Sequence, residues 1–121
     1  MSQLRVGVDL VQISRIAGSL EAFGDRFLRR VFTDDEVAYA RASPDVASRL
    51  ATRFAAKEAA KKALVLDGIG WRDLEVRRRA DGACDLVLHG AARAAAGACT
   101  LALSMSRDGD YATAIVIAQP T

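Results

Sequence analysis

The segment from residue 45 to about residue 66 constrains the fold more than any other part of the sequence. It is rich in alanine, contains neither glycine nor proline, and follows a break at Ser43-Pro44. Asp45 stands where a helix would begin, so these features predict one long helix. A chain of 121 residues has room for one hydrophobic core. We therefore expect this helix to be the central element of a single domain that spans residues 1–121.

Most of the remaining sequence is predicted to form strands. Residues 4–11 alternate between two faces, with Val6, Val8 and Leu10 on one of them. Turn signals at Asp81-Gly82 and at Arg107-Asp108-Gly109 predict two hairpins. The paired segments are residues 73–79 with 84–89, and residues 99–106 with 110–118.

Shorter helices are expected between these strands. Ser14 is placed to cap a helix that continues to about Phe23 and ends at Gly24. Thr33 and Glu36 have the spacing of a capping box for another helix. We expect a turn over residues 25–30 and a short helix over residues 91–96. Together these elements predict an α+β fold, with an antiparallel sheet packed on one long central helix.

Hydropathy argues against a membrane-bound or secreted protein. The longest apolar runs, such as residues 111–118, are much shorter than the roughly 20 residues that span a bilayer. Arg5 and Asp9 interrupt the apolar run near the start, so we expect no signal peptide. We predict a cytoplasmic protein without a membrane partner, in which Cys84 and Cys99 are free thiols.

The charges gather in two segments although the net charge is only +2. Residues 49–62 hold five basic residues against Glu58 alone, and residues 15–30 hold four arginines against two acidic residues. Such patches fit a phosphate-bearing ligand, an acidic protein partner, or solvated helix faces. A nucleic-acid partner is disfavoured, because aromatic residues make up only 6% of the chain and do not alternate with the basic ones.

Two carboxylates stand in apolar surroundings. Asp9 lies within an apolar strand, where it would need an arginine partner, a loop to cap or a metal. Glu58 shares one side of the long helix with Phe54 and Val65, and it either pairs with Lys62 one turn later or has a functional role. Together Asp9 and Glu58 suit a hard cation such as Mg²⁺, which binds one or two carboxylates and substrate phosphates.

Two motifs resemble the signatures of the holo-acyl-carrier-protein synthase family, the small type of 4′-phosphopantetheinyl transferase. They are VGVDLV at residues 6–11 and RFAAKEAAKKAL at residues 53–64. Shorter matches cover most of the chain, at Arg15-Ile16, Arg26-Phe27, Val31-Phe32-Thr33, Gly70-Trp71, Leu103-Ser104 and Asp110-Tyr111-Ala112.

The resemblance implies an enzyme that transfers the phosphopantetheine arm of coenzyme A to a serine of acyl carrier protein, for fatty-acid biosynthesis. It implies that Asp9 and Glu58 bind Mg²⁺ and that Lys62 neutralises or protonates the leaving phosphate. Either Glu58 or a metal-activated water would be the base for the serine. The residues expected to bind coenzyme A are Arg53, Lys57, Lys62 and Ser104.

The family resemblance also implies partners. Its small members are homotrimers with an active site at each subunit junction, and Arg15, Arg26 and Arg30 fall on the segment that meets the carrier protein. The chain departs from the family pattern at Met105, where histidine is common, and at residues 81–84, where a Gly-Lys-Pro turn is common. These departures leave open an enzyme for polyketide or peptide-synthase carriers, or a catalytically weakened relative that binds the carrier.

Overall fold

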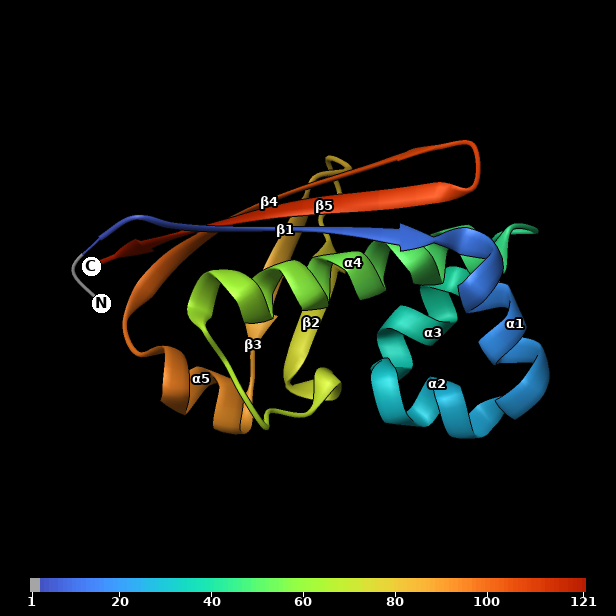
Figure 1. Cartoon of the computed structure of the whole chain (residues 1–121), viewed down its shortest axis with the longest axis horizontal. Coiled ribbons are helices and arrows are strands. Elements are labelled where there is room, and N and C mark those ends of the chain that lie inside the picture. Colours follow the sequence, from blue (N-terminus) through green and yellow to red (C-terminus); the bar gives the residue numbers. More distant parts are fainter. Residues whose placement is uncertain (1–2) are drawn as a thin grey trace.

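The computed structural model describes residues 3–121 and has the expected α+β architecture. The long helix α4 (Val46–Leu64) lies along the inner face of a three-stranded antiparallel sheet (Figure 1). This sheet has the order β1-β5-β4 and is built from β1 (Arg5–Gln12), β5 (Tyr111–Pro120) and β4 (Cys99–Asp108). Asp45 caps α4 by accepting a hydrogen bond from the Ser48 amide, as the sequence predicted.

Small residues bring α4 unusually close to β1. The alanines on the inner side of the helix, from Ala55 to Ala63, are almost completely buried. Opposite them stands Gly7, where an added Cβ would lie 2.0 Å from the Ala59 carbonyl oxygen. Only glycine allows this approach, so Gly7 sets how β1, and with it Asp9, lies against α4.

Three short helices cover one end of α4: α1 (Ile13–Phe23), α2 (Asp25–Val31) and α3 (Asp34–Arg41). The capping box of Thr33 and Glu36 begins α3 as predicted. The turn predicted for residues 25–30 is wrong, because that segment is α2. Gly24, at φ +52°, changes the chain direction within one residue. Burial of Leu28 and Val31 then stabilises α2. This helix is too short to show a clear helical periodicity in the sequence.

The predicted cap at Ser14 is also wrong. Helix α1 begins directly after β1, with Gln12 at the N-cap position and no side-chain cap. Ser14 instead bonds to Asp110 across the sheet end, with its amide 2.9 Å and its hydroxyl 2.6 Å from the carboxylate oxygens. Because Ser14 and Asp110 are 96 residues apart in the sequence, no local pattern indicated this contact.

The remaining strands form a second sheet. The 3₁₀ turn η1 (Trp71–Asp73) leads into β2 (Leu74–Arg78), which pairs only with β3 (Cys84–Leu88) within residues 3–121. Helix α5 (Gly90–Ala96) then connects β3 to β4. The expectation of one sheet was therefore incomplete: β3 and β4 both line one hollow but do not pair.

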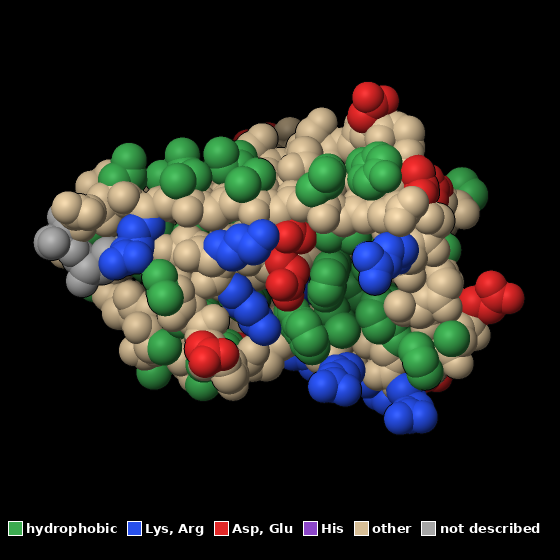
Figure 2. All heavy atoms as spheres, viewed as in Figure 1, with side chains coloured by type: hydrophobic (Ala, Val, Ile, Leu, Met, Phe, Trp, Pro, Cys, Tyr) green, Lys and Arg blue, Asp and Glu red, His purple; other side chains and the backbone are tan. Residues whose placement is uncertain are grey.

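The outer face of the three-stranded sheet is apolar and exposed. Val6, Val8 and Leu10 are 59–66% exposed, and Ile115 and Ile117 lie beside them on β5. Figure 2 shows a row of hydrophobic side chains over β1 along one edge of the molecule. None of the helices in residues 3–121 has the length and hydropathy needed to cross a bilayer.

Candidate active site

Asp9 points from β1 toward α4 and pairs with a lysine. Lys62 Nζ lies 2.9 Å from Asp9 Oδ1 and donates a second hydrogen bond to the Val8 carbonyl at 3.0 Å. The Asp9 side chain is 16% exposed, whereas that of Lys62 is 56% exposed. The carboxylate is therefore held near the surface by a cation that solvent and ligands can reach.

Glu58 lies one turn before Lys62 on α4 and is half-buried. Its Oε1 accepts a hydrogen bond from the indole Nε1 of Trp71. The pairing of Glu58 with Lys62, one of the two alternatives drawn from the sequence, is not what the structure shows, because Lys62 bonds to Asp9 instead. Figure 2 shows acidic and basic side chains meeting beneath β1, beside an apolar area.

The two carboxylates fit a hard divalent cation whose other ligands are waters and substrate phosphates. Asp9 Oδ1 and Glu58 Oε1 are bonded, but Asp9 Oδ2 and Glu58 Oε2 have no hydrogen-bond partner in the described part of the chain. No cluster of three or more metal-ligating side chains occurs among residues 3–121. Mg²⁺ commonly keeps several waters and binds one or two carboxylates plus substrate phosphates, so two oxygen ligands suffice.

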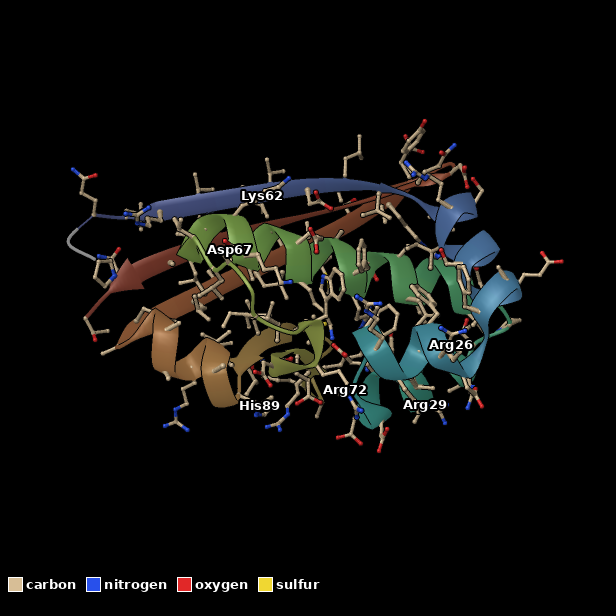
Figure 3. The ribbon with its side chains drawn as sticks, turned by 60° about the horizontal axis from the view of Figure 1, so that its bottom comes forward. Arg26, Arg29, Lys62, Asp67, Arg72 and His89 are labelled. Carbon is tan, nitrogen blue, oxygen red and sulfur yellow. The ribbon has the colours of Figure 1, made fainter. Side chains whose placement is uncertain are left out.

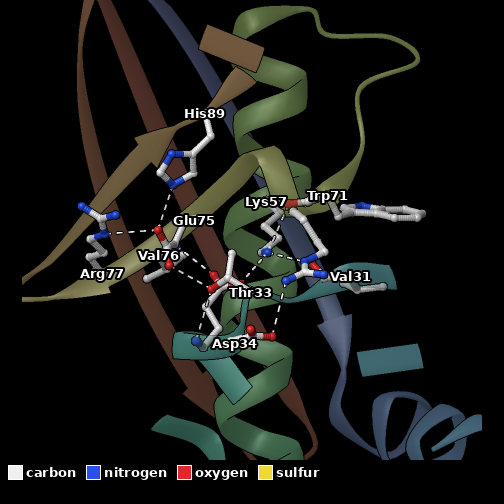
Figure 4. A network of polar contacts seen from close by, with 11 residues as sticks. Val31, Thr33, Asp34, Lys57, Trp71, Glu75, Val76, Arg77 and His89 are labelled. Atoms are coloured by element: carbon white, nitrogen blue, oxygen red, sulfur yellow. Dashed lines mark hydrogen bonds and ion pairs between the residues drawn. The ribbon is translucent and has the colours of Figure 1, made fainter. Parts of the chain in front are cut away.

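Lys57 lies where no phosphate can contact it, which corrects its predicted role. Its side chain is fully buried, with Nζ 2.6 Å from Glu36 Oε1 and 2.7 Å from the Val31 carbonyl (Figure 4). Nζ also donates to the Trp71 carbonyl at 3.1 Å. Burial lowers the pKa of Lys57, and the Glu36 carboxylate only partly offsets that effect. This lysine joins α2, α3, α4 and η1 in the interior.

A second carboxylate extends the same buried network. Glu75 Oε2 accepts from the Thr33 hydroxyl at 2.9 Å, and Oε1 lies 2.8 Å from His89 Nε2 and 3.1 Å from Arg77 Nε. Burial raises the pKa of Glu75, but the hydrogen bonds from His89 and Thr33 and the charge of Arg77 together lower it below its usual value. Glu36 completes the network by accepting from the Val76 amide at 2.9 Å.

Arg53 lies in a different hollow, of about 350 Å³, which we call the arginine hollow. Arg49 and Arg53 stack on the Tyr39 ring, with their Cζ atoms 4.0 and 4.3 Å from its centroid. The lining residues that matter here are Tyr39, Arg49, Arg53, Arg78, Met105 and Arg107. The family resemblance had indicated Arg53 for a phosphate, and the structure adds Arg78 from β2 and Arg107 from near the end of β4 to the same hollow.

Ser104 points away from Asp9. The pairing of Val8 with Ile115 and of Ile115 with Ser104 puts these residues in one row across the sheet. Ser104 is exposed with Val8 on the outer face, whereas Asp9 faces α4. Within one chain, Ser104 and Asp9 therefore lie on opposite faces of the sheet.

The three arginines predicted to meet the carrier protein are exposed. Arg15 lies on α1, and Arg26 and Arg30 lie on α2. None of the three has an acidic partner within 4 Å in the part of the chain that the structure describes. Figure 3 shows Arg26 and Arg29 on α2, with Arg72 on the adjacent segment.

Comparison with known proteins assigns the chain to a family. The family model described as "4'-phosphopantetheinyl transferase superfamily" matches residues 5–116. The chain belongs to this superfamily. A holo-[acyl-carrier-protein] synthase of Nitratidesulfovibrio vulgaris is 48% identical over 118 residues, which is 93% of this chain and 94% of the relative. The corresponding protein of Koribacter versatilis is 42% identical over 120 residues, 94% of this chain and 96% of the relative.

Solved structures of phosphopantetheinyl transferases share the whole fold. The "Chronobacterium ammoniagenes ACPS-CoA complex" superposes with a TM-score of 0.89 at 34% identity, covering 98% of both chains. A Helicobacter pylori holo-[acyl-carrier-protein] synthase in complex with coenzyme A gives a TM-score of 0.85 at 29% identity, covering 94% of this chain and 99% of that one. The resemblance seen in the two sequence motifs and the predicted fold class are thus confirmed.

Proposed function

We propose that this chain transfers the 4′-phosphopantetheine arm of coenzyme A to a serine of apo-acyl carrier protein and releases adenosine 3′,5′-bisphosphate. The observation that carries the proposal is the group of Asp9, Glu58 and Lys62 between β1 and α4. Asp9 pairs with the exposed Lys62, and Glu58 lies one helical turn before that lysine. Asp9 Oδ2 and Glu58 Oε2 have no hydrogen-bond partner among residues 3–121. The relatives named holo-[acyl-carrier-protein] synthase support the same reaction.

In this reaction the serine hydroxyl oxygen bonds to the β-phosphorus of coenzyme A. The bond from that phosphorus to the bridging oxygen breaks, the bisphosphate leaves, and the hydroxyl proton passes to a base in the site. Asp9 and Glu58 would hold Mg²⁺, which supplies Lewis-acid stabilisation of the pyrophosphate charge. The Lys62 ammonium would leave Asp9 and pair with the leaving phosphate. The exposure of the Lys62 side chain permits this movement.

Coenzyme A carries a further phosphate at its nucleotide end, and the positive charge of the arginine hollow suits it. Arg53 and its neighbours Arg49, Arg78 and Arg107 would bind the nucleotide end, with the guanidinium groups of Arg49 and Arg53 held in place by stacking on Tyr39. Ser104 lies on the strand that lines this hollow through Met105. Lys57 has no part in the binding.

We also propose a homotrimer in which each active site is completed by a second copy. Glu58 and Arg53 are five residues apart on α4, which puts them about 140° apart around the helix. One chain therefore presents its carboxylates and its arginine hollow in different directions. The exposed apolar face of Val6, Val8, Leu10, Ile115 and Ile117 offers the surface that a neighbouring copy would cover.

The reaction is tested by incubating the protein with apo-carrier protein, coenzyme A and Mg²⁺, and then weighing the carrier. We expect the mass to increase by one phosphopantetheine group, and the increase to be lost with chelator or in Asp9→Asn. Carrier proteins of fatty-acid, polyketide and peptide synthases, compared by kcat/KM, identify the physiological substrate. An unmodified carrier in every case would refute the proposed function and favour a carrier-binding relative.

The shared site is tested by mixing two inactive variants, Arg53→Ala and Glu58→Gln. In a trimer with junctional sites, some junctions would pair Glu58 of one copy with Arg53 of the next, so the mixture should regain part of the wild-type rate. Light scattering gives the assembly state of each variant. Trimeric variants whose mixture stays inactive would contradict a site built from two copies.

For the carrier protein, we propose docking on the arginines of α1 and α2. Charge reversal at Arg15, Arg26 or Arg30 should raise the KM for the carrier and leave that for coenzyme A nearly unchanged. Added salt should weaken carrier binding in parallel, since exposed charges are screened. An unchanged carrier KM would refute the docking surface. The expected cytoplasmic location stays a prediction.

A further inference from the structure

The Trp71 ring lies along one side of α4, where it contacts Phe54, Glu58 and Lys61. Its ring centroid is 6.0 Å from that of Phe54, and the Lys61 ammonium stands 4.3 Å above the indole. Between them, Glu58 accepts the indole N–H. Residues 54, 58 and 61 are neighbours on a helix surface, so a single ring contacts all three.

The backbone of Trp71 is held as firmly as its ring. Its carbonyl accepts a hydrogen bond from the buried Lys57 ammonium at 3.1 Å, and Lys57 is bound in turn to Glu36 and to the Val31 carbonyl. Figure 4 shows Lys57 reaching the Trp71 backbone while the ring extends to the other side. The position of the indole is therefore set from the interior of the molecule.

We propose that Trp71 is a positioning residue that orients the Glu58 carboxylate for metal binding, an inference that rests on the proposed function. Glutamate has three side-chain torsions and on a half-exposed helix surface would sample several rotamers. The indole N–H holds Oε1, while Oε2 has no hydrogen-bond partner among residues 3–121 and remains free for the metal. Groups that orient metal ligands in this way typically contribute 10- to 100-fold in affinity or activity.

The test removes the N–H and keeps an aromatic ring. In Trp71→Phe, with coenzyme A present, we expect the dissociation constant for Mn²⁺, measured by calorimetry, to rise 10- to 100-fold. Phe54→Leu is the matched control, because it loosens the same aromatic contact but leaves the N–H of Trp71 in place. Its Mn²⁺ affinity should remain near wild type even where its thermal unfolding midpoint falls as far as that of Trp71→Phe.

Fluorescence gives a second measurement, since Trp71 is the single tryptophan of the chain. Titration of the wild type with Mg²⁺ should change the indole emission with a midpoint equal to the Mg²⁺ dissociation constant. The change should be absent in Glu58→Gln, whose amide oxygen can still accept the N–H.

The outcomes separate the positioning role from the proposed function. If Trp71→Phe binds Mn²⁺ as tightly as wild type, or only as weakly as Phe54→Leu, Trp71 is a packing residue and the positioning role is overturned, while the proposed function stands. If the wild type with coenzyme A binds no Mn²⁺ at all, the metal site fails and the positioning role fails with it.

Discussion

Replacing Lys57 with methionine tests whether this lysine supports the fold or binds a phosphate. Methionine fills a similar volume but leaves the carboxylate of Glu36, whose side chain is fully buried, without its cation. It also removes the donor to the Val31 and Trp71 carbonyls. Breaking a buried ion pair from one side costs about 3–5 kcal/mol. Since small domains have only about 5–15 kcal/mol in total, Lys57→Met should be severely destabilised.

The assay is urea unfolding followed by circular dichroism, with the KM for coenzyme A measured under conditions where the variant is folded. We expect a much lower unfolding midpoint and, with Mg²⁺ at saturating concentration, a KM near that of wild type. The double variant Lys57→Met with Glu36→Gln should be more stable than Lys57→Met alone, because it no longer buries an unpaired charge. A Lys57→Met protein with wild-type stability and a selectively raised KM for coenzyme A would refute the reasoning.

Three further predictions concern packing, affinity and pH. Gly7→Ala should lose at least about 1–3 kcal/mol in urea unfolding, because its Cβ would meet the Ala59 carbonyl, whereas Gly18→Ala, with open space around its Cβ, should be neutral or stabilising. Met105→His should tighten coenzyme A binding roughly ten- to a hundredfold in calorimetry by adding a donor for phosphate, and equal or weaker binding would contradict this. Glu75 has a lowered pKa in the folded protein, so its contribution to stability is present above its ordinary value of 4.5 and is lost as the pH falls through the folded value. The urea midpoint should therefore drop in acid, and Glu75→Gln should flatten that dependence.

Local signals in the sequence were sufficient for most elements. Asp45 at the start of α4, the capping box of Thr33 and Glu36 and the Asp81-Gly82 turn all act within a few residues, and each was predicted correctly. The turn assigned to residues 25–30 failed because α2 is stabilised by burial of Leu28 and Val31 in a core that only the folded chain creates. The separation of the strands into two sheets likewise depends on long-range pairing.

The sequence predicted those residues of the candidate site whose charged side chains stand in apolar surroundings, because such placement is unusual. Asp9 and Glu58 were singled out in this way, and family resemblance added Lys62. The phosphate-binding role that the resemblance implied for Lys57 does not fit its burial. Its partner Glu36 lies 21 residues away, so no local pattern in the sequence indicated the ion pair. Trp71 gave no chemical signal at all, since its bond to Glu58 exists only once η1 packs on α4.

Helix α4 explains how so few residues provide several distinct environments. Its 19 residues direct Arg53 into the arginine hollow, Lys57 into the interior, and Glu58 and Lys62 toward β1 and η1. Because these side chains share one rigid helix, their relative positions change little. The distance between that helix and Asp9 on β1 is not fixed by the helix itself. It is set by the close approach of the two elements at Gly7, which lies two residues before Asp9 on the same strand. The same glycine therefore controls both the packing of the sheet on the helix and the distance between Asp9 and Lys62, so stability and activity should depend on it together.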